Sequence, residues 1–91
     1  MAPMHTYMVD CDLPGMTREQ LAGSEARIQR ACEQAVARGD VVRYLRAVWV
    51  PGDGRVMYLF QARDATSVEA VCQAAEVSFL RVVDAVDGSG R

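Results

Sequence analysis

The stretch VDCDLPGMTREQ, residues 9–20, contains the end of a strand, a turn and the start of a helix, and it decides how the chain begins to fold. Residues 5–11 (HTYMVDC) alternate with a period of two, which predicts a strand. The Leu-Pro-Gly sequence that follows predicts a turn. Thr17 and Gln20 have the spacing of a capping box, so we expect a helix to start at Thr17. Asp10, Cys11 and Asp12 at the end of the strand raise the question of a catalytic or metal site.

The rest of the chain continues the same alternation of strands and helices. Apolar residues at helical spacing carry the first helix to about residue 38. Thr66 and Glu69 form a second capping box, which predicts a short helix from Thr66. Strands are predicted at residues 41–50, 55–62 and 79–86, the first two joined by the turn sequence PGDG. The order β-α-β-β-α-β predicts a ferredoxin-like α+β fold, a four-stranded antiparallel sheet with two helices on one face.

Composition limits the classes of function. The chain has 91 residues, and 51% of them are hydrophobic, which favours one folded domain over residues 1–91. We expect an ordered core over about residues 5–87 and a flexible tail at 88–91. The formal net charge of -2 gives no basic field for nucleic acid or a membrane surface. No apolar run approaches the ~20 residues that span a bilayer, and no secretion signal is apparent, so we expect a cytoplasmic protein.

The basic residues and cysteines narrow the chemistry further. All ten basic residues are arginines, so a lysine Schiff base is excluded. With a single histidine, a multi-His metal site within one chain is impossible, and a Cys-His or Ser-His-Asp unit would need His5. The three cysteines are far apart in sequence, which predicts free thiols. Cys32 and Cys72 fall on apolar helix faces, so we expect them to be buried packing residues. We expect Cys11 to be an inward-facing small residue rather than a nucleophile.

The sheet face without helices is the expected binding surface. Strict alternation predicts that this open face carries Thr6, Met8, Asp10, Met57, Leu59, Gln61, Val82, Asp84 and Val86. The second strand is ambiguous, because Arg43 and Arg46 fall on opposite faces. So apolar a face predicts a homodimer in which two open faces meet and enclose a cavity. An apolar cavity with a few polar groups is the usual form of a small-molecule site, and a plain dimer interface is the alternative.

Two open-face acids, Asp10 and Asp84, are the candidate catalytic residues. Burial and mutual repulsion would raise the pKa of one of them, which suits general acid–base chemistry. Arg43 or Arg46 would orient an anionic oxygen, and Trp49 would be a ligand or interface anchor. The alternative is that both acids pair with arginines at the rim of the dimer. The candidate ligand-binding residues are Met8, Arg43, Arg46, Trp49, Met57, Leu59 and Gln61.

A metal site is the second possibility, built from His5, Asp10 and Asp12. Imidazole and carboxylate ligands suit nickel or another divalent ion. Neighbouring residues of a strand point to opposite faces, so Asp10 and Cys11 cannot share a site on a regular strand. A bulge or the turn would have to bring Asp12 to Asp10, or a dimer would have to double the ligands. For His5 the alternative is a solvated side chain.

Four segments together resemble a family of small bacterial proteins, best known for a nickel-binding, ferredoxin-like dimer from an actinobacterium. The segments are VDCDLPGMTREQL, VVRYLRAVWV, VMYLFQARDATSVEAV and LRVVDAV. The resemblance implies the fold and the dimer. Family members often have Cys, Glu and His where this chain has Tyr58, Gln61 and Val71, whereas Asp84 keeps the acid. These departures weaken an inherited nickel site.

We therefore expect a soluble homodimer that binds a small molecule or a divalent metal ion between or beside its sheets. No cofactor is certain from the sequence, and neither nucleic acid nor a membrane is an expected partner. A cofactor-independent enzyme of the cyclase, isomerase or hydrolase type, acting on a small hydrophobic metabolite, is one alternative. A pure interaction module is another.

Overall fold

Strands and helices follow one another in the predicted order. The computed structural model describes residues 4–85. Its elements are β1 (His5–Asp12), α1 (Arg18–Ala37), β2 (Val42–Val50), the short 3₁₀ turn η1 (Pro51–Asp53), β3 (Arg55–Ala62), α2 (Ala65–Ala74) and β4 (Arg81–Ala85). The expected contribution of Val86 to the last strand, and the tail at 88–91, lie outside the described residues.

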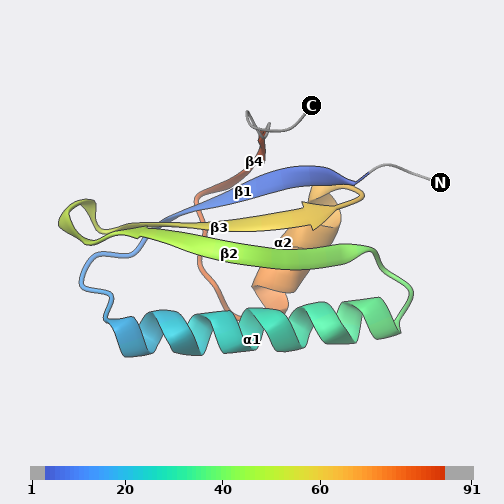
Figure 1. The fold of residues 1–91 in the computed structure, drawn as a ribbon, viewed down its shortest axis with the longest axis horizontal. Helices are drawn as coiled ribbons and strands as arrows, with labels where there is room; N and C mark the ends of the chain where they lie inside the picture. The colour runs from blue at the N-terminus through green and yellow to red at the C-terminus, as the bar shows by residue number, and fades with distance from the viewer. Residues whose placement is uncertain (1–3, 86–91) are drawn as a thin grey trace.

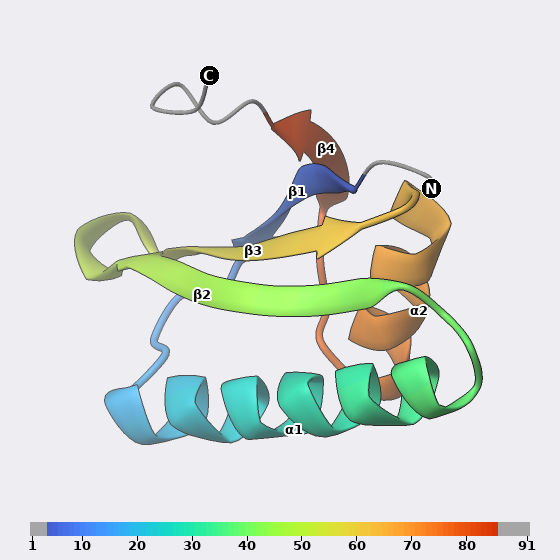
Figure 2. The same ribbon diagram turned by 45° about the vertical axis from the view of Figure 1, so that its right-hand side comes forward.

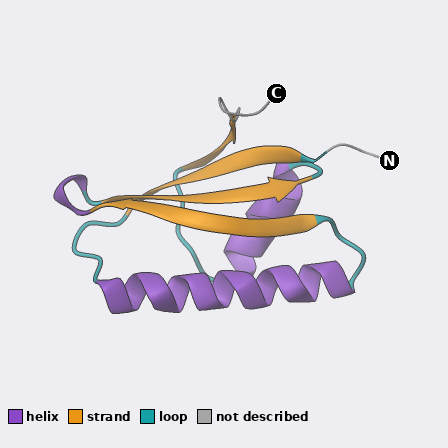
Figure 3. Cartoon of the chain, in the orientation of Figure 1, coloured by secondary structure: helices purple, strands orange, loops and turns teal. Residues whose placement is uncertain are grey.

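The four strands form one antiparallel sheet in the order β2-β3-β1-β4. Both helices lie on the same side of this sheet, so the fold has two layers (Figures 1 and 3). The view in Figure 2 shows the opposite face of the sheet with neither helix over it. The ferredoxin-like α+β arrangement predicted from the sequence is therefore confirmed, including the central places of β1 and β3.

The core lies between the sheet and the helices. The inward residues of β1 and β3 are those expected from alternation, and all are buried: Tyr7, Val9, Cys11, Val56, Tyr58, Phe60 and Ala62. The helices contribute Ile28, Cys32 and Ala35 from α1 and Val68, Val71 and Cys72 from α2. Because a close-packed interior holds each side chain in place, this core fixes which residues of the central strands reach the open face.

The turn in the opening stretch packs against the β2–β3 hairpin. The amide of Leu13 donates to the carbonyl of Gly54 at 2.7 Å. Gly54 has a φ of +63°, and a Cβ there would lie 2.9 Å from the Cα of Pro14. Glycine is required at this point both for the left-handed backbone and for the close approach of the Leu-Pro-Gly turn.

A β-bulge in β2 decides the orientation of that strand, which was ambiguous from the sequence. Tyr44 lies opposite Phe60, whereas Arg46 lies opposite Leu59, so one extra residue stands between them. Directly opposed residues of antiparallel strands point to the same side of the sheet. Arg43 and Arg46 therefore share the open face, which strict alternation could not give.

The same shift turns Trp49 away from the open face. Trp49 lies opposite Val56 and packs against the core. Its predicted place as an open-face anchor is therefore wrong. The reason is again the extra residue in β2, which reverses the alternation for the second half of the strand.

The orientation of β4 is also opposite to the prediction. Val82 lies opposite Val9 and Asp84 opposite Tyr7, so both belong to the helix side of the sheet. Arg81 lies opposite Asp10 and is therefore on the open face. The prediction failed because β4 has valines at neighbouring positions, and a period of two cannot choose between them.

The two helices begin at side-chain caps, of which the sequence predicted one. The amide of Gln20 donates to Thr17 Oγ1 at 3.1 Å, and the amide of Thr17 donates to Gln20 Oε1 at 3.0 Å. This is the predicted capping box. The start predicted for the second helix is wrong, because its cap is Asp64, which accepts from the amide of Ser67 at 3.0 Å. Thr66 lies within the first turn and is exposed.

The caps can be tested by alanine substitution. Thr17→Ala and Asp64→Ala should each lower the free energy of unfolding by about 1 kcal/mol, because each removes the acceptor for an otherwise unpaired helix amide. Thr66→Ala is the matched control and should change it little. Urea titrations followed by circular dichroism measure the effect. A loss at Thr66 equal to that at Asp64 would contradict this assignment.

Candidate functional site on the open face of the sheet

The centre of the open face is apolar. Leu59 of β3 lies opposite Met8 of β1, and Met8 lies opposite Val83 of β4. These three half-buried side chains form a row across the sheet, which we call the apolar row. Met57 is half-buried in the next row, and Val48 beyond it on β2 is 42% exposed. Water therefore reaches a continuous apolar surface over two neighbouring rows of the sheet.

Beside the apolar row, Asp10 is held in an ion-pair cluster with two arginines. Its carboxylate accepts hydrogen bonds from Arg55 Nη2 at 2.5 and 2.6 Å, and Arg81 Nε lies 3.4 Å away. The residue is only 3% exposed. Hydrogen bonding from Arg55 holds the pKa of Asp10 below its ordinary value, against the opposing effect of burial. The raised pKa that the sequence suggested for an acid–base residue is therefore not found at Asp10.

The predicted catalytic pair of Asp10 and Asp84 is not assembled. Asp10 lies on the open face opposite Arg81, whereas Asp84 lies opposite Tyr7 on the helix side. The sheet itself separates the two carboxylates. The expected pairing of an acid with arginines does occur for Asp10, but within one chain rather than across a dimer.

The predicted metal ligands do not converge either. His5 lies opposite Ala62 at one end of β1, and Asp12 lies opposite Arg55 at the other end. Seven residue-to-residue steps along the strand separate them by roughly 23 Å. His5 is exposed, with its ring edge-on to Tyr7 at 6.3 Å. Among residues 4–85, no three His, Cys, Asp or Glu side chains are grouped closely enough to hold a metal ion.

Two predicted ligand-binding arginines remain available on the face. Arg43 and Arg46 are exposed on the edge strand β2, one row apart. Within the described part of the chain, neither has a carboxylate oxygen within 4.0 Å. Gln61 is half-buried between Arg43 and Thr6. All of the predicted ligand-binding residues except Trp49 thus lie on the open face.

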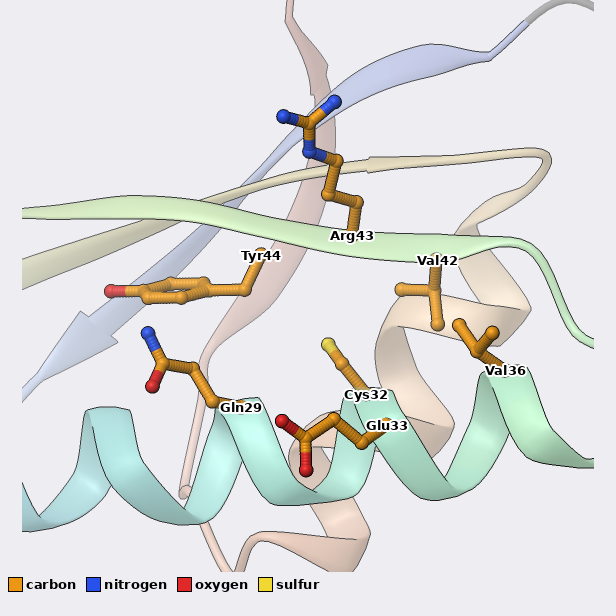
Figure 4. Close-up of a pocket in the computed structure, with 7 residues that line it drawn as sticks. All are labelled: Gln29, Cys32, Glu33, Val36, Val42, Arg43 and Tyr44. Atoms are coloured by element: carbon orange, nitrogen blue, oxygen red, sulfur yellow. The ribbon is translucent and has the colours of Figure 1, made fainter.

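A second surface feature, absent from the sequence predictions, is a cleft of about 430 Å³ between α1 and β2 (Figure 4). In this view the side chain of Arg43 points away from the cleft. The hydroxyl of Tyr44 donates to Glu25. The signal for this cleft in the sequence is Val36, an apolar residue beside the core-facing stripe of α1, and it is 54% exposed in the structure. The lining residues are Gln29, Cys32, Glu33, Val36, Val42, Arg43 and Tyr44.

None of the three cysteines is placed for nucleophilic chemistry. All are buried free thiols, which confirms the inward orientation expected for Cys11. Burial raises the pKa of Cys11 and of Cys32 to about 11 and that of Cys72 to about 12. Because the thiolate is the reactive species, burial disfavours reaction of these thiols in the folded protein at neutral pH.

Comparison with known proteins bears on the fold. No family model and no curated protein matches the chain. The structure is similar to SCO4226 from Streptomyces coelicolor A3(2), with a TM-score of 0.73 and 20% sequence identity, over 88% of this chain and 94% of that one. This similarity supports the ferredoxin-like arrangement. Neither α1 nor α2 is long and apolar enough to cross a membrane.

The ion pair of Asp10 can be tested through its pH dependence. Because the folded-state pKa is lowered, the pair stabilises the fold fully above about pH 4, the ordinary value for Asp, and the effect is lost as the pH falls through the folded-state pKa. Asp10→Asn should cost about 1–2 kcal/mol at pH 7, since the partner arginines are partly exposed. Urea titrations at pH 7 and pH 3 measure this.

The control is Asp12→Asn on the same strand, which should change stability little. Asp12 is exposed, and no arginine among residues 4–85 lies within 4.0 Å of its carboxylate. An Asp10→Asn cost that is the same at pH 3 as at pH 7 would argue against a charged Asp10 in the folded state.

The thiols provide an independent test of the core. At pH 8, a thiol with a pKa of about 11 is roughly one-thousandth thiolate. We therefore expect Ellman's reagent to titrate all three cysteines at once in urea and none within minutes in buffer. Rapid modification of Cys11 in the folded protein would show that it is accessible after all.

Proposed function

We propose that the protein is a cytoplasmic homodimer that binds a small molecule between its two open sheet faces. The observation that carries this proposal is the apolar row of Met8, Leu59 and Val83 on the sheet face opposite the helices. Removing apolar surface from water contributes about 25 cal/mol per Å². Contiguous apolar patches of this kind usually mark a partner or ligand surface.

The polar groups around the row are consistent with such a cavity. Arg55 and Arg81 already pair with the carboxylate of Asp10. A partner protomer that covers Asp10 would therefore not bury an unpaired charge. Gln61 and Arg46 border the row on its β2 side. A few polar groups around an apolar centre would orient a ligand there.

The enzyme and metal alternatives receive less support from the geometry. Asp10 has a lowered pKa and lacks Asp84 as a partner, so it is poorly suited to acid–base catalysis. A nickel site built from His5 and the aspartates would need ligands from two protomers, because His5 and Asp12 lie at opposite ends of β1.

The dimer is tested with a charge in the apolar row. Wild-type protein should sediment at twice the mass of the chain, and Leu59→Lys should shift it to the monomer, because two lysines would face one another in the interface. Val36→Lys is the matched control, since Val36 is an exposed apolar residue on α1, and it should remain dimeric. Analytical ultracentrifugation measures the mass.

Circular dichroism should show that both variants stay folded, because the open face contributes little to the core. A wild-type protein that sediments as a monomer at all accessible concentrations would overturn the proposal. So would a Leu59→Lys variant that is folded and dimeric.

A further inference from the structure

The open face has a charge opposite to that of the rest of the chain. Its register positions hold four arginines, at 43, 46, 55 and 81, and two aspartates, at 10 and 12, which gives +2. The whole chain has a formal charge of -2, so the remaining residues carry -4. Positive charge is therefore concentrated on the apolar open face of an acidic protein.

The two arginines of β2 are the uncompensated part of this charge. Arg55 and Arg81 share the carboxylate of Asp10. Arg43 and Arg46 have no such partner within residues 4–85, and the bulge between Tyr44 and Arg46 brings both onto the open face. A bulge re-aims side chains in this way at the cost of a regular ladder.

Two such faces repel each other as they close into a dimer. A face-to-face dimer would bring together a formal charge of +4 around an apolar interior, where like charges repel more strongly than in water. An anionic group between the faces relieves this repulsion. Guanidinium groups bind carboxylates through paired, charge-assisted hydrogen bonds, so two adjacent arginines suit a carboxylate well.

The apolar row sets the size of the rest of the ligand. It begins beside Arg46 and runs from Leu59 through Met8 to Val83, across three neighbouring strands. Strands of a sheet lie about 4.8 Å apart, so the row is about 10 Å long. A chain of about eight carbons, or a flat ring system of that length, covers it.

We propose, on the basis of the proposed function above, that the ligand is an amphipathic anion. Its carboxylate is bound by Arg43 and Arg46 at the β2 edge, with Gln61 beside them, and its apolar body of about 10 Å lies along the apolar row. The competing arrangement is direct pairing of these arginines with Asp12 of a second copy, which needs no ligand.

Three eight-carbon probes that differ in their head group test the ligand class. Octanoate should bind the wild-type dimer at least about tenfold more tightly than 1-octanol, and octylammonium should bind most weakly, because only the carboxylate matches the arginines. Isothermal titration calorimetry measures each affinity. The double variant Arg43→Gln/Arg46→Gln should lose the preference for octanoate over octanol.

The control is Arg30→Gln, which removes one charge from the exposed side of α1 and should keep the preference. Equal binding of octanoate and octanol, or a preference that survives the double substitution, would overturn this inference while leaving the dimer and a neutral ligand standing. A double variant that becomes monomeric, from a wild type that ignores octanoate, would show instead that the arginines pair between copies. A monomeric wild type would overturn the proposed function itself.

Discussion

Helices cover only one face of the sheet, and this asymmetry decides the environment of every strand residue. A side chain of β1 or β3 enters a close-packed core or reaches the opposite surface according to its parity alone. The Leu-Pro-Gly turn helps to hold β1 in this orientation, because the amide of Leu13 donates a hydrogen bond to Gly54 of the hairpin. Cys11 is consequently a core residue and Asp10 a surface-side residue, although they are neighbours in the sequence.

The chemistry of the open face follows from how its charges are distributed. Arg55 and Arg81 pair with Asp10 and lower its pKa, which makes this carboxylate poorly suited to general acid–base chemistry. The β2 bulge places two further arginines on the same face without a described acidic partner. An apolar centre with a positive edge is suited to binding rather than to proton transfer, and this is the basis for proposing a ligand-binding dimer rather than an enzyme.

Much of the fold could be predicted because its signals are local. Alternation gave the two faces of β1 and β3, and the spacing of Thr17 and Gln20 gave the start of α1. The bulge in β2 leaves no mark in the sequence, so the faces of Arg46 and Trp49 could not be derived. In β4, the neighbouring valines are compatible with either orientation of the strand. The predicted orientation was the wrong one, so the predicted pairing of Asp10 with Asp84 was wrong as well. The arginine partners of Asp10 are distant in sequence and become its neighbours only through strand pairing.

The solvent exposure of methionine methyl groups tests most directly whether two open sheet faces meet in a dimer. With ¹³C-methyl labelling, a soluble paramagnetic probe should broaden the signal of Met4, which is 43% exposed, far more than the signals of Met8 and Met57 on the open face. If two open faces meet in a dimer, Met8 and Met57 are shielded at high protein concentration and become accessible in Leu59→Lys. Methyl groups of Met8 and Met57 that are as accessible in the concentrated wild-type protein as in Leu59→Lys would contradict it.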